Sequence, residues 1–210
     1  MAQERLIDIA IREFGLHGLD GASTRSIAAA AGTAMSAITY HYGGKEGLYL
    51  AAADHIAERL ASDMGDVLPT LDALPAEAGA ARTAIHVIVS RFVDKMASSD
   101  TESWSLFIMR EQMRPTEAFN RIYAGMMGQM LERLATLIGA ATGVDEARAR
   151  LVTITLIGQV IVLRSSRASC LRLLKRSEVD DGLIADMKRQ IGRNLDAIFD
   201  TMTAEGPQPQ

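Results

Sequence analysis

Cysteine, proline and aromatic residues are scarce in this chain of 210 residues, and basic residues do not outnumber acidic ones. The single cysteine, Cys170, excludes an internal disulfide and a zinc or iron–sulfur site built from several thiolates. The 22 lysines and arginines against 26 aspartates and glutamates give a formal net charge of -4. A basic field over the whole surface is therefore absent, and any contact with nucleic acid must be local.

Segments that would place the chain in or across a membrane are also missing. The longest apolar run, 151–163, is interrupted by polar residues and a glycine. It is shorter than the roughly 20 residues that span a bilayer. The first residues lack the succession of basic, apolar and small residues that marks a signal peptide. We therefore expect a cytoplasmic protein with no membrane partner.

The sequence lacks the signatures of common enzyme classes and metal centres. Gly44-Lys45 is followed by a glutamate and has no earlier glycine at the spacing of a phosphate-binding loop. No Glu-x-x-His pair is present for a di-iron bundle, and the four histidines do not have the spacing of metal ligands. Cys170 has no histidine near it in the sequence that could activate its thiol. These absences predict a protein that is not an enzyme and needs neither a cofactor nor a metal.

Apolar residues recur at helical spacing along nearly the whole chain, and with only five prolines this predicts an all-α fold. The glycines at 15, 18 and 21 are expected to end the first helix, and the two prolines in 68–79 predict a loop. We expect a helix-turn-helix unit at 1–47, a larger ligand-binding and dimerisation bundle at 48–203 and a disordered tail at 204–210. The predicted helices are 3–16, 24–31, 35–42, 45–64, 80–98, 101–113, 116–138, 145–174 and 180–201.

The second and third of these helices have the spacing of a helix-turn-helix. Ala28 supplies a small residue where the two helices meet, and Gly32 supplies the positive φ that the turn needs. Ile38 is the apolar residue that fixes the second helix to the core. A plain helical hairpin within a bundle would show the same spacing. The composition argues against the hairpin, because no acidic residue lies between Gly21 and Lys45 and the exposed groups are neutral hydrogen-bonding ones.

Two stretches of the chain resemble a known family. Ser23-Thr24-Arg25-Ser26-Ile27-Ala28, then Ala31-Gly32, then Ile38-Thr39-Tyr40-His41-Tyr42-Gly43-Gly44-Lys45-Glu46-Gly47-Leu48-Tyr49 resemble the amino-terminal signature of TetR-family transcriptional regulators, in the CecR-like branch. Residues 110–116 (REQMRPT), with 156–159 and Arg164, resemble the carboxy-terminal domain of that branch. The resemblance implies a helical homodimer that represses transcription on operator DNA and leaves it when a small ligand binds.

The resemblance also implies which side chains contact DNA. In the family, one group begins the supporting helix, a second faces the major groove and a third approaches the phosphate backbone. The residues matching these groups are Thr24 and Arg25, then Met35, Ser36, Thr39 and Tyr40, then His41 and Lys45. Lys45 has an independent argument, because a phosphate at the start of its helix would be held by backbone N–H groups as well as by the ammonium. Ala34 stands where a capping residue is common, so Thr33 is expected to cap the recognition helix instead.

The second half of the chain has two stripes of large apolar residues. One stripe includes a carboxylate, and the other is rich in methionine, which adapts to irregular cavities. The stripes line either a ligand pocket or an ordinary core. Glu111 either pairs with Arg110, Arg114 or Arg164 or anchors a cationic or hydrogen-bonding group of a ligand. His86 is expected to be a satisfied core histidine. The predicted ligand-binding residues are Trp104, Phe107, Glu111, Tyr123, Met126 and Met130.

The apolar run 151–163 and the last helix are the candidates for a dimer interface, as two helices of a four-helix bundle. A dimer would set two recognition helices ~34–36 Å apart, which is one turn of DNA. We therefore predict a DNA-binding transcriptional regulator, a repressor released from double-stranded operator DNA by a small-molecule effector. The alternative is a helical ligand-binding or scaffolding dimer without DNA activity.

Overall fold

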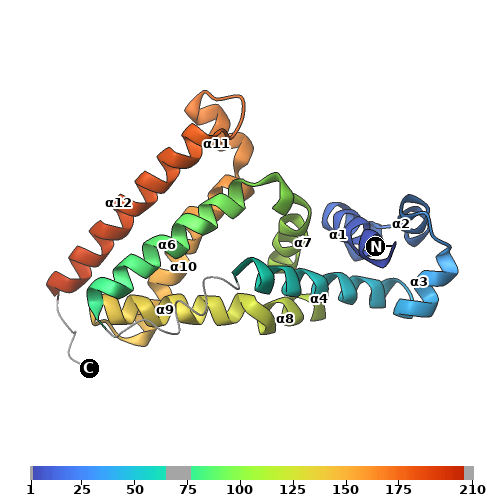
Figure 1. Cartoon of the computed structure of the whole chain (residues 1–210), viewed down its shortest axis with the longest axis horizontal. Helices are drawn as coiled ribbons and strands as arrows, with labels where there is room; N and C mark the ends of the chain where they lie inside the picture. The colour runs from blue at the N-terminus through green and yellow to red at the C-terminus, as the bar shows by residue number, and fades with distance from the viewer. Residues whose placement is uncertain (1, 65–76, 206–210) are drawn as a thin grey trace. The chain divides into compact units, whose positions relative to one another are not determined.

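The computed structural model describes residues 2–64 and 77–205, and these residues form helices without a β-strand (Figure 1). The all-α prediction is therefore confirmed. Most of the predicted loop at 68–79 and of the predicted tail at 204–210 lies outside the described residues. Their described ends are helical, since one helix begins at Ala78 and another ends at Glu205.

The chain divides into two compact units. The first unit is Met1–Met64 with Asp100–Gly128, and the second is Gly65–Ser99 with Gln129–Gln210. The helices of the first unit are α1 (Ala2–Gly21), α2 (Thr24–Ala31), α3 (Met35–Tyr42), α4 (Lys45–Met64), α7 (Glu102–Met113) and α8 (Glu117–Ile122), followed by a π-helical turn, Tyr123–Met127. Those of the second are α6 (Ala78–Ala97), nearly all of α9 (Gly128–Thr142), α10 (Glu146–Ser165), α11 (Arg167–Leu174) and α12 (Asp181–Glu205). A short 3-10 turn, Ser99–Thr101, precedes α7.

Local signals fix the three helices at the start of the first unit. The hydroxyl of Ser23 caps α2 by accepting a hydrogen bond from the Ser26 N–H at 3.3 Å. Gly32 and Gly43 end α2 and α3 with left-handed φ values of 69° and 73°, which a glycine adopts without strain. Ile38 is 1% exposed and joins α3 to the core. The expected ends of both helices are confirmed.

Several expected helix ends are wrong, because tertiary contacts override the local pattern. The first helix runs through Gly15 to Gly21 with a break at Gly18, where φ is 72°. The expected helix 116–138 is interrupted by the π-helical turn, inside which Gly125 has a ψ of -140°. The expected helix 145–174 bends by 82° at Ser166, between α10 and α11. Thr33 does not cap α3: the capping position belongs to Ala34, which makes no side-chain hydrogen bond.

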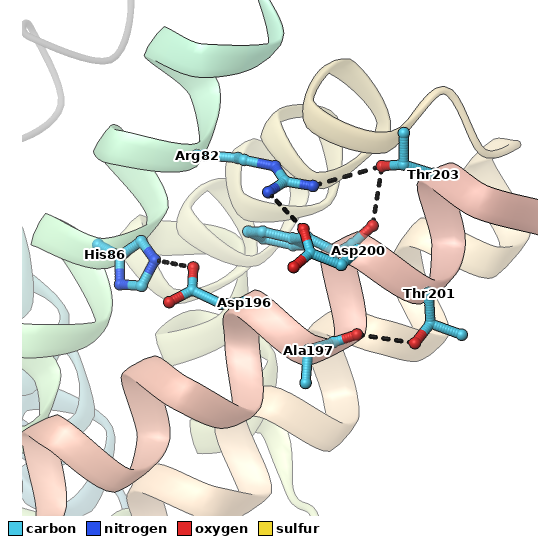
Figure 2. Close-up of polar contacts among 8 residues, drawn as sticks. Arg82, His86, Asp196, Ala197, Asp200, Thr201 and Thr203 are labelled. Atoms are coloured by element: carbon cyan, nitrogen blue, oxygen red, sulfur yellow. Dashed lines mark hydrogen bonds and ion pairs between the residues drawn. The ribbon is translucent and has the colours of Figure 1, made fainter.

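In the second unit, α6 packs against α10 and α12. Figure 2 shows part of the polar contact between α6 and α12. The Arg82 guanidinium donates to Asp200 at 2.8 Å and to the Thr203 hydroxyl at 3.3 Å. The His86 ring is bonded to Asp196 at 2.8 Å, but 36% of its side chain is exposed. His86 is therefore satisfied, as expected, but it is not a core residue.

Within residues 2–64 and 77–205, no single helix is both long and apolar enough to cross a bilayer. The bent pair α10 and α11 passes the same test only when its two helices are taken together.

Candidate nucleic-acid interface

The outer face of α3 presents the side chains that the sequence predicted to face DNA. Tyr40 is 85% exposed and Met35 is 50% exposed, and Ser36, Thr39 and His41 are also exposed. The rings of Tyr40 and His41 meet edge to face, with centroids 4.9 Å apart. The helix therefore buries Ile38 and leaves hydroxyl, imidazole and thioether groups exposed on the rest of its surface, where base edges could meet them.

α2 packs against α3, and its first turn supplies a cation. Arg25 is exposed and Thr24 is half-buried in the first turn of α2. Among the residues that the structure describes, Arg25 forms no ion pair with an acidic side chain. Because no acid lies between Gly21 and Lys45, the surface of α2 and α3 has no negative charge to repel a phosphate.

Lys45 opens α4 directly after α3, and its ammonium already has one partner. Its Nζ donates to the Asp20 carbonyl oxygen at 3.0 Å, which ties the start of α4 to the end of α1. An ammonium has three donors, so two remain for a phosphate. Two glycines with positive φ, Gly43 at 73° and Gly44 at 121°, turn the chain between α3 and α4. The structure thus gives Lys45 a bracing role in addition to the predicted phosphate contact.

Two acidic side chains of the first unit pair with arginines outside α2 and α3. Asp8 accepts from Arg59 at 3.1 Å, and Asp54 accepts from Arg121 at 2.7 Å. In the described part of the chain, no group of three or more histidine, cysteine, aspartate or glutamate side chains could hold a metal ion. The exposed surface of α2 and α3 is therefore suited to hydrogen bonding and to local phosphate binding.

The predicted ligand-binding residues are distributed over both units. Trp104, Phe107 and Glu111 are buried in α7, with exposures of 6%, 0% and 1%. In the π-helical turn, Tyr123 is 42% exposed and Met126 is half-buried. Met130 is 8% exposed and belongs to the second unit. The set remains a prediction.

The Glu111 carboxylate is bonded to groups that sequence reasoning missed. Its Oε1 accepts from the Tyr49 hydroxyl at 2.6 Å. Its Oε2 accepts from the N–H and hydroxyl of Thr116 and from the Phe119 N–H, at 3.0, 2.8 and 3.1 Å. Burial and the hydrogen bond to Glu111 raise the pKa of Tyr49 well above its ordinary value. The REQMRPT segment was the available signal, since it contains both Glu111 and Thr116.

Comparisons with known families match both parts of the chain. Residues 6–52 match the family described as "Bacterial regulatory proteins, tetR family". Residues 81–202 match the family described as "HTH-type transcriptional dual regulator CecR, C-terminal domain".

Individual relatives agree with these families. The chain is 34% identical over 176 residues to the HTH-type transcriptional dual regulator CecR of Shigella flexneri, covering 81% of this chain and 78% of the relative. It is 39% identical over 71 residues to the HTH-type transcriptional regulatory protein RaaS of Mycobacterium tuberculosis, covering 34% of this chain and 33% of that relative.

A solved structure of a TetR-like transcriptional regulator from Rhodococcus sp. RHA1 has the same fold, with a TM-score of 0.66 and 18% identity over 93% of this chain and 96% of that one. The TetR-family regulator SCO4454 of Streptomyces coelicolor gives a TM-score of 0.66 and 16% identity over 96% of each chain. The chain therefore belongs to the TetR family of bacterial transcriptional regulators, with a CecR-type carboxy-terminal domain, and it is a DNA-binding transcriptional regulator.

Proposed function

We propose that this regulator is a cytoplasmic homodimeric repressor that covers its operator with α2 and α3 and leaves the DNA when an effector binds. The exposed, acid-free face of α3 carries the proposal, because a solvated helix face normally contains charged residues of both signs. Met35, Ser36, Thr39 and Tyr40 would read base edges in the major groove. Thr24, Arg25, His41 and Lys45 would bind the phosphate backbone.

The second unit offers a surface for dimerisation. On α10, Leu151 and Ile154 are 61% and 68% exposed, although both belong to its apolar run. An open groove of about 380 Å³ lies between α10 and α12, and its lining residues are Arg148, Val152, Ala197, Ile198, Thr201 and Met202. Exposed apolar area beside a groove favours burial against a partner. We propose that α10 and α12 pair with the same helices of a second copy as a four-helix bundle.

Effector binding would act through α4. This helix begins directly after α3, and it packs against α8 and the π-helical turn. The π-helical turn contains Tyr123 and Met126 of the predicted ligand set, and such turns occur frequently at functional sites. We propose a functional division at 1–47 for DNA binding and 48–203 for effector binding and dimerisation. An effector with equal affinity for the DNA-bound and free arrangements could not release DNA.

A mobility-shift assay with the gene's own upstream region tests the proposal. The wild-type protein should shift this DNA, whereas Arg25→Ala and Tyr40→Ala should each lose the shift. Arg12→Ala is the matched control, since it removes one exposed cation from the first unit outside α2 and α3. If the wild-type protein does not shift the DNA, or if Arg25→Ala and Tyr40→Ala shift it as the wild type does, the proposed recognition of this operator by α2 and α3 fails.

A further inference from the structure

We propose that Arg110 and Glu111, two consecutive residues of α7, are positioning residues for DNA binding. They fasten α7 to α1 and α4, the helices that lie before and after the helix-turn-helix in the chain. This inference rests on the proposed function, and it gives a role to the REQMRPT segment that the DNA surface leaves unexplained. We refer to Arg110, Glu111 and Tyr49 as the α7 clamp.

Arg110 holds α1 near the break in that helix. Its Nε donates to the Gly15 carbonyl at 3.3 Å, and its Nη2 donates to the Leu16 carbonyl at 2.9 Å. Two residues later the backbone of Gly18 has non-helical dihedral angles, so the regular series of helical hydrogen bonds is interrupted here. A Cβ at Gly18 would lie 3.0 Å from Nη1 of Arg110. The guanidinium therefore fits closely over the break and supplies donors to carbonyl groups beside it.

Glu111 holds α4 and α8 with one buried carboxylate. Tyr49 of α4 is 3% exposed and its hydroxyl donates to Oε1. The Tyr49 ring lies 4.8 Å from Phe14 of α1 and 4.6 Å from Phe107 of α7, measured between centroids. Three donors at the start of α8 fill the other oxygen, Oε2. A carboxylate has about two acceptor positions on each oxygen, so these hydrogen bonds saturate Oε2 of Glu111 and use one position of Oε1.

Close packing reinforces these polar contacts. A Cβ at Gly15 would lie 3.0 Å from the Ser103 carbonyl oxygen and 3.2 Å from the Phe107 nitrogen, both of them backbone atoms of α7. The backbones of α1 and α7 therefore approach each other so closely that a side chain at position 15 would require them to move apart by a few tenths of an ångström. At the far end of α1, the bond from Lys45 to the Asp20 carbonyl joins α1 to α4. The orientation of α3 thus depends on two helices that α7 fixes.

The clamp has a specific consequence for a dimer on a two-fold operator. Two recognition helices must meet two half-sites at one fixed spacing. If the clamp sets the direction of each α3, loosening it weakens binding to the full operator and makes binding less sensitive to the spacing of the half-sites. Binding to a single half-site needs only one folded helix-turn-helix, so it should not change.

The experiment compares Arg110→Ala and Tyr49→Phe with the wild type. Arg114→Ala is the matched control, because it removes the same charge from an exposed position at the end of α7. The probes are the operator duplex defined by footprinting in the gene's upstream region, the same duplex with one base pair inserted between the half-sites, and a single half-site. Thermal unfolding is recorded for each variant.

We expect both clamp variants to bind the native operator about tenfold more weakly, as for the loss of one hydrogen bond to a charged group. Half-site affinity should stay within about twofold of wild type, and the penalty for the inserted base pair should shrink. Arg114→Ala should match the wild type in its operator affinity, its half-site affinity and its penalty for the inserted base pair. The inference is overturned if the clamp variants lose half-site affinity and operator affinity to the same extent and also unfold at a lower temperature. It is also overturned if they bind the operator like the wild type. A wild-type protein that shifts no DNA would overturn the proposed function itself.

Discussion

Gly47 lies where the backbone of α4 approaches the end of α3. A Cβ at this position would lie 1.6 Å from the Tyr42 carbonyl oxygen and 2.8 Å from its carbonyl carbon. Both are backbone atoms, so α3 and α4 would have to separate to admit a methyl group. We expect Gly47→Ala to lower the free energy of unfolding by about 3 kcal/mol. Urea denaturation followed by circular dichroism measures this change.

Gly79, in the first turn of α6, is the control for this substitution. A Cβ there meets no atom within 4 Å, so Gly79→Ala should be neutral or should stabilise the protein by up to about 1 kcal/mol through helix propensity. Equal urea midpoints for Gly47→Ala and wild type would show that the turn between α3 and α4 does not have this close approach.

Tyr49 gives the stability a dependence on alkaline pH. Burial and its bond to Glu111 raise its pKa, so the native side chain keeps its proton above pH 10, where an unfolded tyrosine loses it. The unfolded state then binds fewer protons, and the free energy of unfolding falls by about 1.4 kcal/mol per pH unit from this one group. Tyr49→Phe should flatten the loss of stability between pH 10 and 11.5 by that amount. Tyr40→Phe, at a position 85% exposed, should leave the wild-type slope unchanged, and identical slopes for all three proteins would contradict the raised pKa.

At the scale of the helix, α3 begins without a side-chain cap. Ala34 occupies the capping position in an extended conformation, with φ -77° and ψ 145°. Serine adopts this conformation readily, and its hydroxyl would accept a hydrogen bond from the first turn of α3. We expect Ala34→Ser to raise the free energy of unfolding by about 1 kcal/mol, measured by urea denaturation.

The matched control for this gain is Ala29→Ser. Ala29 is exposed within α2, where serine has lower helix propensity than alanine and no free N–H to cap. This variant should lose about 0.5 kcal/mol. If both serine variants lose stability alike, the start of α3 is not limited by the missing cap.

Helices that end on local signals could be predicted from the sequence, and helices that end on distant contacts could not. The bounds of α2 and α3 follow from the Ser23 cap and from Gly32 and Gly43, all within a few residues of the ends they fix. At Gly125 and Ser166, by contrast, apolar periodicity continues through a change of direction. Periodicity predicts which residues are buried, but it does not show where a helix bends to follow its neighbours.

The candidate site shows the same limit at the level of side chains. Exposure of Tyr40 follows from its position two residues after Ile38, on the opposite side of a short helix, whereas Met35 lies one turn before Ile38 and its exposure does not follow from this spacing. The bond between Tyr49 and Glu111 joins residues 62 positions apart, and no spacing rule connects them. The sequence marked Glu111 as unusual because a carboxylate lay on an apolar stripe, but only the folded chain brings its four donors to it.

For the whole molecule, charge determines how salt affects binding. Residues 1–60 contain five lysines and arginines against seven acids, a net of -2. Three of the five cations are engaged elsewhere: Arg5 donates to the Ala30 carbonyl, Arg12 pairs with Glu13, and Arg59 pairs with Asp8. Only Arg25 and Lys45 remain among the predicted phosphate contacts, which makes about four ion contacts in a dimer.

Four ion contacts predict a shallow salt dependence for operator binding. Each neutralised phosphate contributes about -0.9 to the slope of log K against log salt concentration, so the slope should be about -4. Titrations of the operator duplex at KCl concentrations from about 50 to about 200 mM, where counterion release changes the affinity strongly, measure this slope. At salt concentrations low enough for Arg25→Ala to bind the operator, this variant should reduce the slope by about two, because each subunit loses one contact. Arg12→Ala should leave it unchanged, since that guanidinium lies beside Glu13. A wild-type slope that requires eight or more ion contacts per subunit would mean that cations outside α2 and the start of α4 also reach the DNA, and the acid-free face of α3 would then be only part of the binding surface.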